Sequence, residues 1–185
     1  MKQGKLIVVS APSGCGKTTI IEHLLKRNRG LKRSISYTTR SPRQGERDGR
    51  DYFFVSKKGF LGKRKKGFFL ESARVFGHWY GTSKAFVKGE LRAGADLVLA
   101  IDVQGMRQLK SKAGREIPMI SIFIMPPSLR VLRMRLAKRK TESHAEITRR
   151  LKVARKEIAA RSLYDFVVVN RKVDKAVNEI EDIVT

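Results

Sequence analysis

A glycine-rich segment near the N-terminus carries the residues best suited to hold phosphate groups. It reads Ser-Ala-Pro-Ser-Gly-Cys-Gly-Lys-Thr over positions 10–18, between an apolar run and a predicted helix. Gly14 and Gly16 let successive backbone N–H groups turn toward one anion, and the helix that follows adds the positive end of its dipole. Lys17 can reach the outer phosphates of a nucleotide, and the hydroxyl of Thr18 can ligate Mg²⁺. The predicted nucleotide-binding residues are Ser13, Gly14, Cys15, Gly16, Lys17, Thr18 and Thr19.

Two residues of this segment leave alternatives open. Ala11 stands where the strict phosphate-loop pattern G-x-x-x-x-G-K-[ST] has its first glycine, so a glycine-rich turn that binds no nucleotide is the competing interpretation. Cys15 lies close to Lys17 and to a helix N-terminus, both of which lower a thiol pKa, and a redox switch is one hypothesis. The other, which we favour, is a small residue that contributes only its backbone N–H.

Two arginines farther along the chain form a second candidate anion site. Arg40 and Arg43 lie three residues apart and can supply the planar, multidentate clamp that a mononucleotide phosphate needs. The phenolic hydroxyls of Tyr52 and Tyr80 can donate hydrogen bonds to the same phosphate. The competing interpretation is that both arginines are solvated surface charges.

Short apolar strands alternate with amphipathic helices along the chain, which is typical of an α/β fold with a mostly parallel sheet covered by helices. The apolar runs are continuous, as in strands that are buried on both faces. Predicted strands lie at 6–9, 97–101, 120–124 and 166–169. Predicted helices lie at about 18–28, from 129 onward, around 147–158 and around 173–184. Residues 34–90 break the alternation with glycine, proline and paired aromatic residues, and indicate an inserted lobe.

The size and composition of the chain predict one soluble domain. Its 185 residues are close to an average domain of roughly 150 residues, and 41% hydrophobic residues suffice for a packed core. A single cysteine excludes an internal disulfide and indicates a reducing compartment. No uncharged stretch reaches the about 20 residues of a membrane span. We therefore expect a cytoplasmic protein with no membrane partner, and the sequence leaves its oligomeric state open.

The chain is strongly basic, with 41 Lys and Arg against 17 Asp and Glu and a net charge of +24. Such an excess calls for an anionic partner, which could be nucleic acid, anionic lipid or a small polyphosphate. The run 57–66 alone holds six cations and no acid. No RNA-recognition aromatic signature, paired Cys/His metal spacing or basic-region heptad accompanies these charges. Charge alone therefore permits nucleic-acid binding without predicting it.

Several motifs together resemble the guanylate kinase family. The most specific, S-x-T-T-R-x-P-R-x-G-E, occupies positions 36–46. Further matching motifs follow in order at 49–54, 69–73, 77–82, 101–105, 126–128 and 169–170. With the phosphate loop they cover nearly the whole chain. The resemblance implies a P-loop NTPase fold with an inserted nucleoside-monophosphate-binding lobe and a helical lid.

The reaction that the resemblance implies is transfer of the γ-phosphoryl group of ATP to GMP, giving ADP and GDP in purine nucleotide metabolism. Glu71 matches the family's guanine-reading carboxylate, with Ser36 and Thr82 as hydroxyl partners. Guanine presents its N1–H and N2–H₂ donors side by side, whereas adenine presents an acceptor at N1. The implied GMP-binding set is Ser36, Arg40, Arg43, Tyr52, Glu71, Tyr80, Thr82 and Asp102.

The attacking phosphate oxygen of GMP is already largely ionised at pH 7, so no general base is expected. Use of dGMP is left open.

The resemblance also implies a lid rich in arginine that closes over ATP. Arg135, Arg139 and Arg150 match the lid arginines and join Lys17 as the predicted catalytic residues. Asn170 falls in the region that the family places near adenine. The implied single domain has a core at 1–33, 91–128 and 155–185, a GMP-binding lobe at 34–90 and a lid at about 129–154.

Three departures from the family pattern bear on activity. Ala100-Ile101-Asp102 replaces the usual Asp-x-Asp, and Lys138-Arg139-Lys140 replaces Gly-Arg-Gly, removing two hinge glycines. Basic residues at 171–172 replace the acids that usually follow the asparagine. These changes keep open the alternative of a guanylate-kinase-like scaffold domain that binds proteins without catalysis, although the phosphate loop and lid arginines favour the enzyme.

The three histidines, His23, His78 and His144, are expected to be structural or at the surface.

Overall fold

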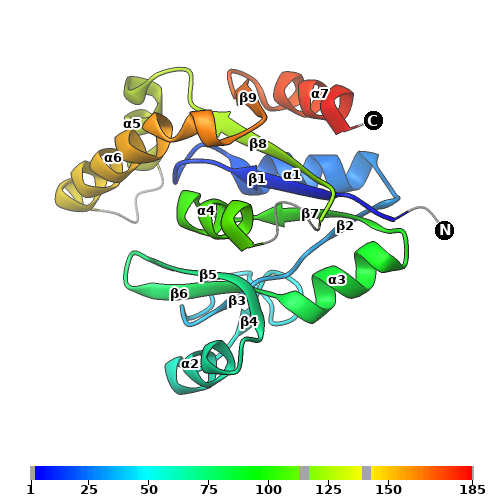
Figure 1. The fold of residues 1–185 in the computed structure, drawn as a ribbon. Helices are drawn as coiled ribbons and strands as arrows, with labels where there is room; N and C mark the ends of the chain where they lie inside the picture. The colour runs from blue at the N-terminus through cyan, green and yellow to red at the C-terminus, as the bar shows by residue number, and fades with distance from the viewer. Residues whose placement is uncertain (1–2, 113–116, 139–142, 185) are drawn as a thin grey trace.

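Five parallel strands form the centre of the molecule in the computed structural model, which describes residues 3–112, 117–138 and 143–184 (Figure 1). They lie in the order β2-β7-β1-β8-β9. Their bounds are Leu6–Ser10 for β1, Leu31–Arg33 for β2, Asp96–Ala100 for β7, Met119–Met125 for β8 and Phe166–Val169 for β9. Because β1 lies between β7 and β8, the loop after β1 opens at the middle of the carboxyl edge of the sheet. Ligands of open α/β sheets bind at such an edge.

The residues of β1 show why both faces of this sheet are buried. Leu6 and Val8 belong to one hydrophobic core, and Ile7 and Val9 belong to the other, as the alternation of a strand requires. Helices on the Ile7 side are α1 (Lys17–Arg27) and α7 (Val173–Val184). Helices on the Leu6 side are α3 (Lys84–Arg92) and α4 (Val103–Lys112).

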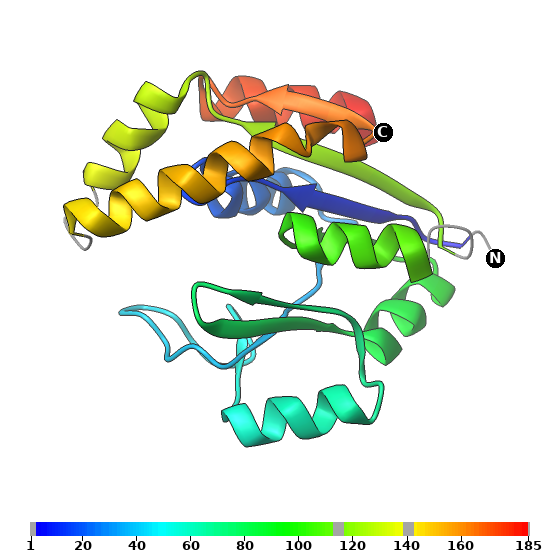
Figure 2. The same cartoon turned by 60° about the vertical axis from the view of Figure 1, so that its left-hand side comes forward.

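A second sheet forms a lobe beside the central one, below it in Figure 1. Its strands, in the order β4-β3-β6-β5, are Phe53–Phe54, Tyr37–Thr38, His78–Ser83 and Phe69–Val75. Helix α2 (Lys57–Lys65) covers the side of this sheet that faces away from the central sheet (Figure 2). The ring of Phe60 in α2 is fully buried and stacks on Phe69 with 4.4 Å between ring centroids. Aromatic packing of this kind anchors the helix to the lobe.

Two helices, α5 (Leu129–Ala137) and α6 (His144–Ala159), form the lid segment. Ser128 and Ser143 cap them, and Ser143 forms a reciprocal capping box with Glu146. The N-terminal end of α6 and the tip of the β5–β6 hairpin both extend beyond the carboxyl edge of the central sheet (Figure 2). A 3₁₀ turn at Arg161–Leu163 then leads into β9.

The predicted α/β fold is confirmed, and each predicted strand and helix is present with ends shifted by up to three residues. The sequence analysis missed β2, α2, α3 and α4. The run 57–66 was expected only to be basic, and it folds as a helix because Ser56 caps it and Phe60 provides a buried anchor. The predicted boundaries at 90 and 154 fall inside α3 and α6. Among the described helices, none combines the length and apolar composition needed to cross a bilayer.

Candidate functional site

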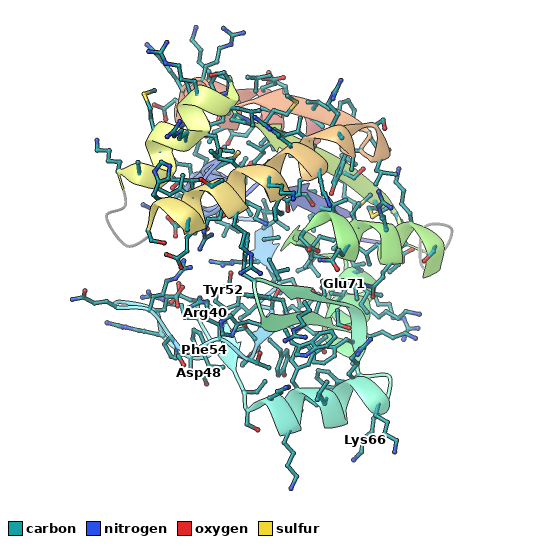
Figure 3. The ribbon with its side chains drawn as sticks, turned by 90° about the vertical axis from the view of Figure 1, so that its left-hand side faces the viewer. Arg40, Asp48, Tyr52, Phe54, Lys66 and Glu71 are labelled. Carbon is teal, nitrogen blue, oxygen red and sulfur yellow. The ribbon has the colours of Figure 1, made fainter. Side chains whose placement is uncertain are left out.

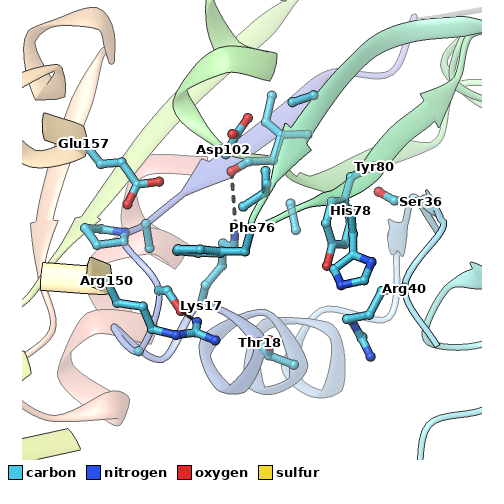
Figure 4. Close-up of a pocket in the computed structure, with 18 of the residues that line it drawn as sticks. Lys17, Thr18, Ser36, Arg40, Phe76, His78, Tyr80, Asp102, Arg150 and Glu157 are labelled. Carbon is cyan, nitrogen blue, oxygen red and sulfur yellow. Dashed lines mark hydrogen bonds between the residues drawn. The ribbon is translucent and has the colours of Figure 1, made fainter. Parts of the chain in front are cut away.

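A cavity of about 500 Å³ opens at the carboxyl edge of the central sheet, between the phosphate loop, the lobe and α6 (Figure 4). It brings together predicted residues that are far apart in the chain. Those that line it are Ser13, Gly14, Gly16, Lys17, Thr18, Thr19, Ser36, Arg40, Arg43, Tyr52, Glu71, Tyr80, Asp102 and Arg150. The two candidate anion sites inferred from the sequence are therefore parts of one cavity.

The glycines of the phosphate loop are required by both conformation and space. Gly14 and Gly16 have φ angles of 91° and 86°, in the left-handed region that favours glycine. A Cβ on Gly14 would lie 2.8 Å from Leu136, and a Cβ on Gly16 would lie 2.8 Å from the Asn170 amide nitrogen. The loop is thus pressed against the lid segment and the end of β9, and α1 begins directly after it at Lys17.

Lys17 is held at the floor of the cavity. Its Nζ donates to the Ile101 carbonyl oxygen at 3.2 Å, the dashed line in Figure 4. Burial lowers the pKa of Lys17, and the nearby Asp102 carboxylate opposes that shift. A cation held at this position, next to the N-terminus of α1, suits an incoming phosphate.

Thr18 lies at the start of α1 with its side chain exposed to the cavity. Among the described residues, no group of three or more His, Cys, Asp or Glu side chains is placed to hold a metal ion. Mg²⁺ commonly keeps several waters and uses substrate phosphates with only one or two protein ligands. The single hydroxyl of Thr18 therefore fits a Mg²⁺ ion that arrives with a nucleotide.

Three predicted site residues that do not line the cavity support the loop: Cys15 lies within it, and Asn170 and Arg135 lie beneath it. Asn170 is buried, and its side-chain amide donates to the Cys15 carbonyl at 2.7 Å. Arg135 donates to the Asn170 carbonyl at 3.0 Å, so it braces this support from α5. The Cys15 backbone N–H donates to the Pro12 carbonyl at 3.1 Å. These residues hold the shape of the loop.

The redox hypothesis for Cys15 is wrong in its physical premise. The thiol is fully buried, and burial raises its pKa to about 12 despite the attraction of Arg135 and Lys17. Desolvation outweighs the nearby positive charges, so the thiol stays neutral and unreactive at ordinary pH. The competing interpretation, a small residue used for its backbone, agrees with its position.

The lobe side of the cavity holds a buried carboxyl group. Glu71 in β5 is 4% exposed, and its Oε1 accepts a hydrogen bond from the Thr82 hydroxyl at 2.6 Å. Burial raises the pKa of Glu71 to about 7, although the Thr82 hydrogen bond acts in the opposite direction. Gly105 in α4 leaves room for this carboxylate, because a Cβ there would lie 2.7 Å from Glu71 Oε2. Asp102 anchors the start of α4 by accepting from the Gly105 N–H at 2.9 Å.

A cationic clamp lies beside this carboxyl group. Arg40 lies over the ring of Tyr52, with 5.5 Å from its guanidinium carbon to the ring centroid, and it pairs with Glu46 at 2.8 Å. Tyr52 and Tyr80 meet edge to face at 6.0 Å. Arg40 and Tyr52 lie on the side of the lobe that faces the central sheet, whereas Lys66 lies on the opposite side (Figure 3). This arrangement can grip a phosphate with guanidinium and phenol donors.

Of the predicted lid arginines, Arg150 reaches the cavity. It donates to the Ser13 hydroxyl at 2.8 Å and thereby links α6 to the phosphate loop. Arg139 and Lys140 lie outside the described residues, so the role predicted for Arg139 stays a prediction.

The sequence analysis missed several residues that line the cavity. Glu157 of α6 lies near Lys17, and burial raises its pKa to about 7, with Lys17 opposing the shift. Phe76 lines the cavity from the hairpin tip, and the exposed His78, which was expected to be structural or at the surface, lines it as well. Only Phe76 carried a local signal, a bulky residue before a glycine between two strands. The others are brought to the cavity by the tertiary fold.

Comparison with known proteins agrees with this geometry. Residues 3–185 match the guanylate kinase family. The chain is 49% identical over 181 residues to the guanylate kinase of Wolbachia sp. subsp. Brugia malayi, covering 98% of this chain and 92% of the relative. It is 48% identical to the guanylate kinase of Caldanaerobacter subterraneus subsp. tengcongensis, covering 99% and 87%.

A solved structure extends the similarity to the fold. The crystal structure of guanylate kinase from Anaplasma phagocytophilum superposes with a TM-score of 0.83 at 34% identity, covering 99% of this chain and 85% of that one. The match spans the central sheet, the lobe and the lid segment together. With the family match over nearly every residue and a cavity that joins a phosphate loop to a buried carboxyl group, the chain belongs to the guanylate kinase family.

Proposed function

We propose that this chain catalyses transfer of the γ-phosphoryl group of ATP to GMP, with the two substrates bound at opposite ends of one cavity. The observation that carries the proposal is that Lys17 and the buried Glu71 line the same cavity. One end offers a phosphate loop, and the other offers a carboxyl group shielded from water. A protein-binding scaffold has no need of either feature.

The GMP end is proposed to read both the base and the phosphate. Glu71 accepts the N1–H and N2–H₂ donors of guanine, while Thr82 holds the carboxylate and Ser36 lies at the cavity wall. Adenine would leave that buried carboxylate facing an acceptor, which a site built on hydrogen bonds rejects strongly. Arg40, Arg43, Tyr52 and Tyr80 grip the phosphate of GMP.

The chemical step needs positioning and charge neutralisation more than proton transfer. A phosphate oxygen of GMP attacks the γ-phosphorus of ATP, the bond from that phosphorus to the β–γ bridging oxygen breaks, and ADP leaves. Lys17 and Arg150 stabilise the negative charge on the transferring group. Mg²⁺, when bound through Thr18, would neutralise further phosphate charge. The proposed ATP end consists of Ser13, Gly14, Gly16, Lys17, Thr18 and Thr19, with Asn170 and Arg135 supporting the loop from below through the Cys15 carbonyl.

A coupled assay of ADP release with ATP and Mg²⁺ tests the proposal, with GMP, dGMP, AMP, CMP and UMP compared as acceptors. We expect turnover selective for guanine nucleotides. Binding of GMP in a calorimeter without turnover would contradict the proposal and favour the scaffold domain. The departures at Ala100 and at the lysines of the lid would then be the first explanation to test for the loss of catalysis.

A second function is favoured by the outer face of the lobe. Helix α2 and its C-cap residue carry Lys57, Lys58, Lys63, Arg64, Lys65 and Lys66, and all but the half-buried Lys63 are exposed. Arg64 lies 4.5 Å from the Trp79 ring centroid and Lys63 lies 4.6 Å from that of Phe68, so two of these cations are held against the aromatic residues of the lobe. We propose that this face binds nucleic acid through its phosphates.

Fluorescence anisotropy with a labelled single-stranded RNA tests this second function. We expect binding that weakens steeply with salt and persists when GMP fills the cavity. Replacing Lys58, Lys65 and Lys66 by glutamine should abolish it without changing GMP turnover. Binding that ignores salt, or that these replacements leave intact, would contradict a role for α2.

A further inference from the structure

The turn that joins β5 to β6 has an unfavourable residue at its tip. Val75 pairs with His78, which leaves Phe76 and Gly77 as a two-residue turn. Their φ angles are 48° and 90°. Among the residues that the structure describes, Phe76 is the only non-glycine residue with a positive φ. Turns of this kind favour Asn-Gly, and a bulky residue there is a genuine outlier. Strain at such a position points to a use for the side chain.

The ring of Phe76 faces the guanidinium of Arg150. The guanidinium carbon lies 4.7 Å from the ring centroid, while a nitrogen of the same group donates to the Ser13 hydroxyl at 2.8 Å. One cation therefore joins the tip of the GMP lobe, the phosphate loop and α6, and all three residues line the cavity (Figure 4). Both Phe76 and Arg150 are half-buried, which strengthens a cation–π contact relative to one in bulk water.

We propose that Phe76 is a positioning residue that holds Arg150 at the boundary between the two substrate sites. The inference rests on the proposed function, in which Arg150 contacts the transferring phosphoryl group. Arginine is long and flexible, and a ring fixed on a two-residue turn restricts where its guanidinium can lie. Because the ring belongs to the GMP lobe and the guanidinium to the lid, the lobe biases the lid arginine toward the reacting phosphate.

Three substitutions at Phe76 distinguish the contribution of its aromatic ring from that of the turn conformation. Phe76→Leu keeps an apolar side chain without a π face, and we expect kcat to fall about 3- to 30-fold while GMP affinity changes less than about twofold. Phe76→Tyr restores the π face and should restore kcat. Phe76→Asn suits the turn, so it should keep or raise the melting temperature and still lower kcat. Phe86→Leu, on the exposed face of α3, is the matched control and should change neither quantity.

A double-mutant cycle with Arg150→Met decides whether Phe76 acts through Arg150. We expect Phe76→Leu to slow the wild-type enzyme and to have no further effect once Arg150 is replaced. The affinity for a non-hydrolysable ATP analogue, measured by calorimetry, should show the same lack of additivity. Equal effects of Phe76→Leu in both backgrounds, or none in either, would overturn the inference. If the wild type fails to phosphorylate GMP, the proposed function fails, and the affinity cycle alone then tests the contact between Phe76 and Arg150.

Discussion

The two ends of the cavity are built in different ways. The phosphate end comes from one continuous segment, positions 10–18, and presents backbone N–H groups, one lysine and the hydroxyls of Ser13 and Thr18. The guanine end comes from side chains on separate strands and loops, among them Ser36, Arg40, Glu71 and Tyr80. Phosphates are alike in every nucleotide, so a local backbone loop suffices to bind them. Discrimination between bases needs a particular buried side chain, and only the assembled lobe can bury it.

Burial shifts the pKa values of the ionisable groups at the two ends in opposite directions. It lowers the pKa of Lys17 and raises the pKa of Glu71 to about 7. In each case removal of the side chain from water shifts its equilibrium toward the uncharged form. An incoming phosphate stabilises the charged lysine, and the donors of guanine stabilise the charged carboxylate. Each end is therefore completed electrostatically by its own ligand.

The largest effect should come from the guanine end. Glu71→Gln offers one acceptor and one donor, a pattern that suits adenine better than guanine. We expect the ratio of kcat/KM for GMP to that for AMP to fall about 10⁴-fold. The ADP-release assay with both acceptors measures it, and KM for ATP should stay constant. An unchanged ratio would show that another residue reads the base.

At the phosphate end, Lys17→Ala should lower kcat by about 10²–10³-fold or more, because one charge that faces the transferring phosphoryl group is lost. GMP affinity, measured by calorimetry, should be unchanged. Lys26→Ala, on the exposed face of the same helix, is the matched control. A comparable loss of GMP affinity would mean that the two ends do not act separately.

A pair of glycine substitutions tests whether the two ends of the cavity act independently. Gly105→Ala would place a Cβ 2.7 Å from Glu71 Oε2, and Gly16→Ala would place one 2.8 Å from Asn170. The first should raise KM for GMP and the second KM for ATP, each by roughly 10- to 100-fold, because small displacements of reacting groups are costly. An effect on KM for the other substrate in each variant would show that the two ends are coupled.

The raised pKa of Glu71 has a consequence for stability. Its folded-state pKa of about 7 lies above the ordinary value of 4.5, so the folded protein retains a proton that the unfolded chain releases between those pH values. Stability should fall as pH rises through this window, by on the order of 1 kcal/mol per pH unit. Urea unfolding should show a flatter pH profile for Glu71→Gln. Identical profiles would place the titration elsewhere, with Glu157 as the next candidate.

The smallest effect is expected from restoring an acid that the family usually has. Ala100 lines the cavity two residues before Asp102, and Ala100→Asp should raise kcat/KM for GMP about fivefold, the equivalent of one added charge interaction of ~1 kcal/mol. The ADP-release assay compares the variant with the wild type. An unchanged rate would indicate that Asp102 already supplies what is needed.

Some site residues could be predicted from the sequence, and others could not. Lys17 and Thr18 were found because a loop between a strand and a helix is a local pattern. Glu71 was found only through the family resemblance, since one glutamate among aromatic residues has no distinctive spacing. Glu157 was missed because its position depends on how α6 crosses the sheet. Cys15 was assigned a lowered pKa from its neighbours, and burial reversed the direction.

Contiguous residues and their spacing were enough to predict four of the five central strands, the helices α1, α5, α6 and α7, the phosphate loop and the family, but not β2, α2, α3 and α4. Only the tertiary structure decided which charges are shielded, which support residues lie beneath the loop, and that Phe76 meets Arg150 across the cavity. The physical reason is that desolvation and cation–π contact depend on distance in space. Segments separated by many residues acquire that distance only when the lobe and the lid fold onto one sheet.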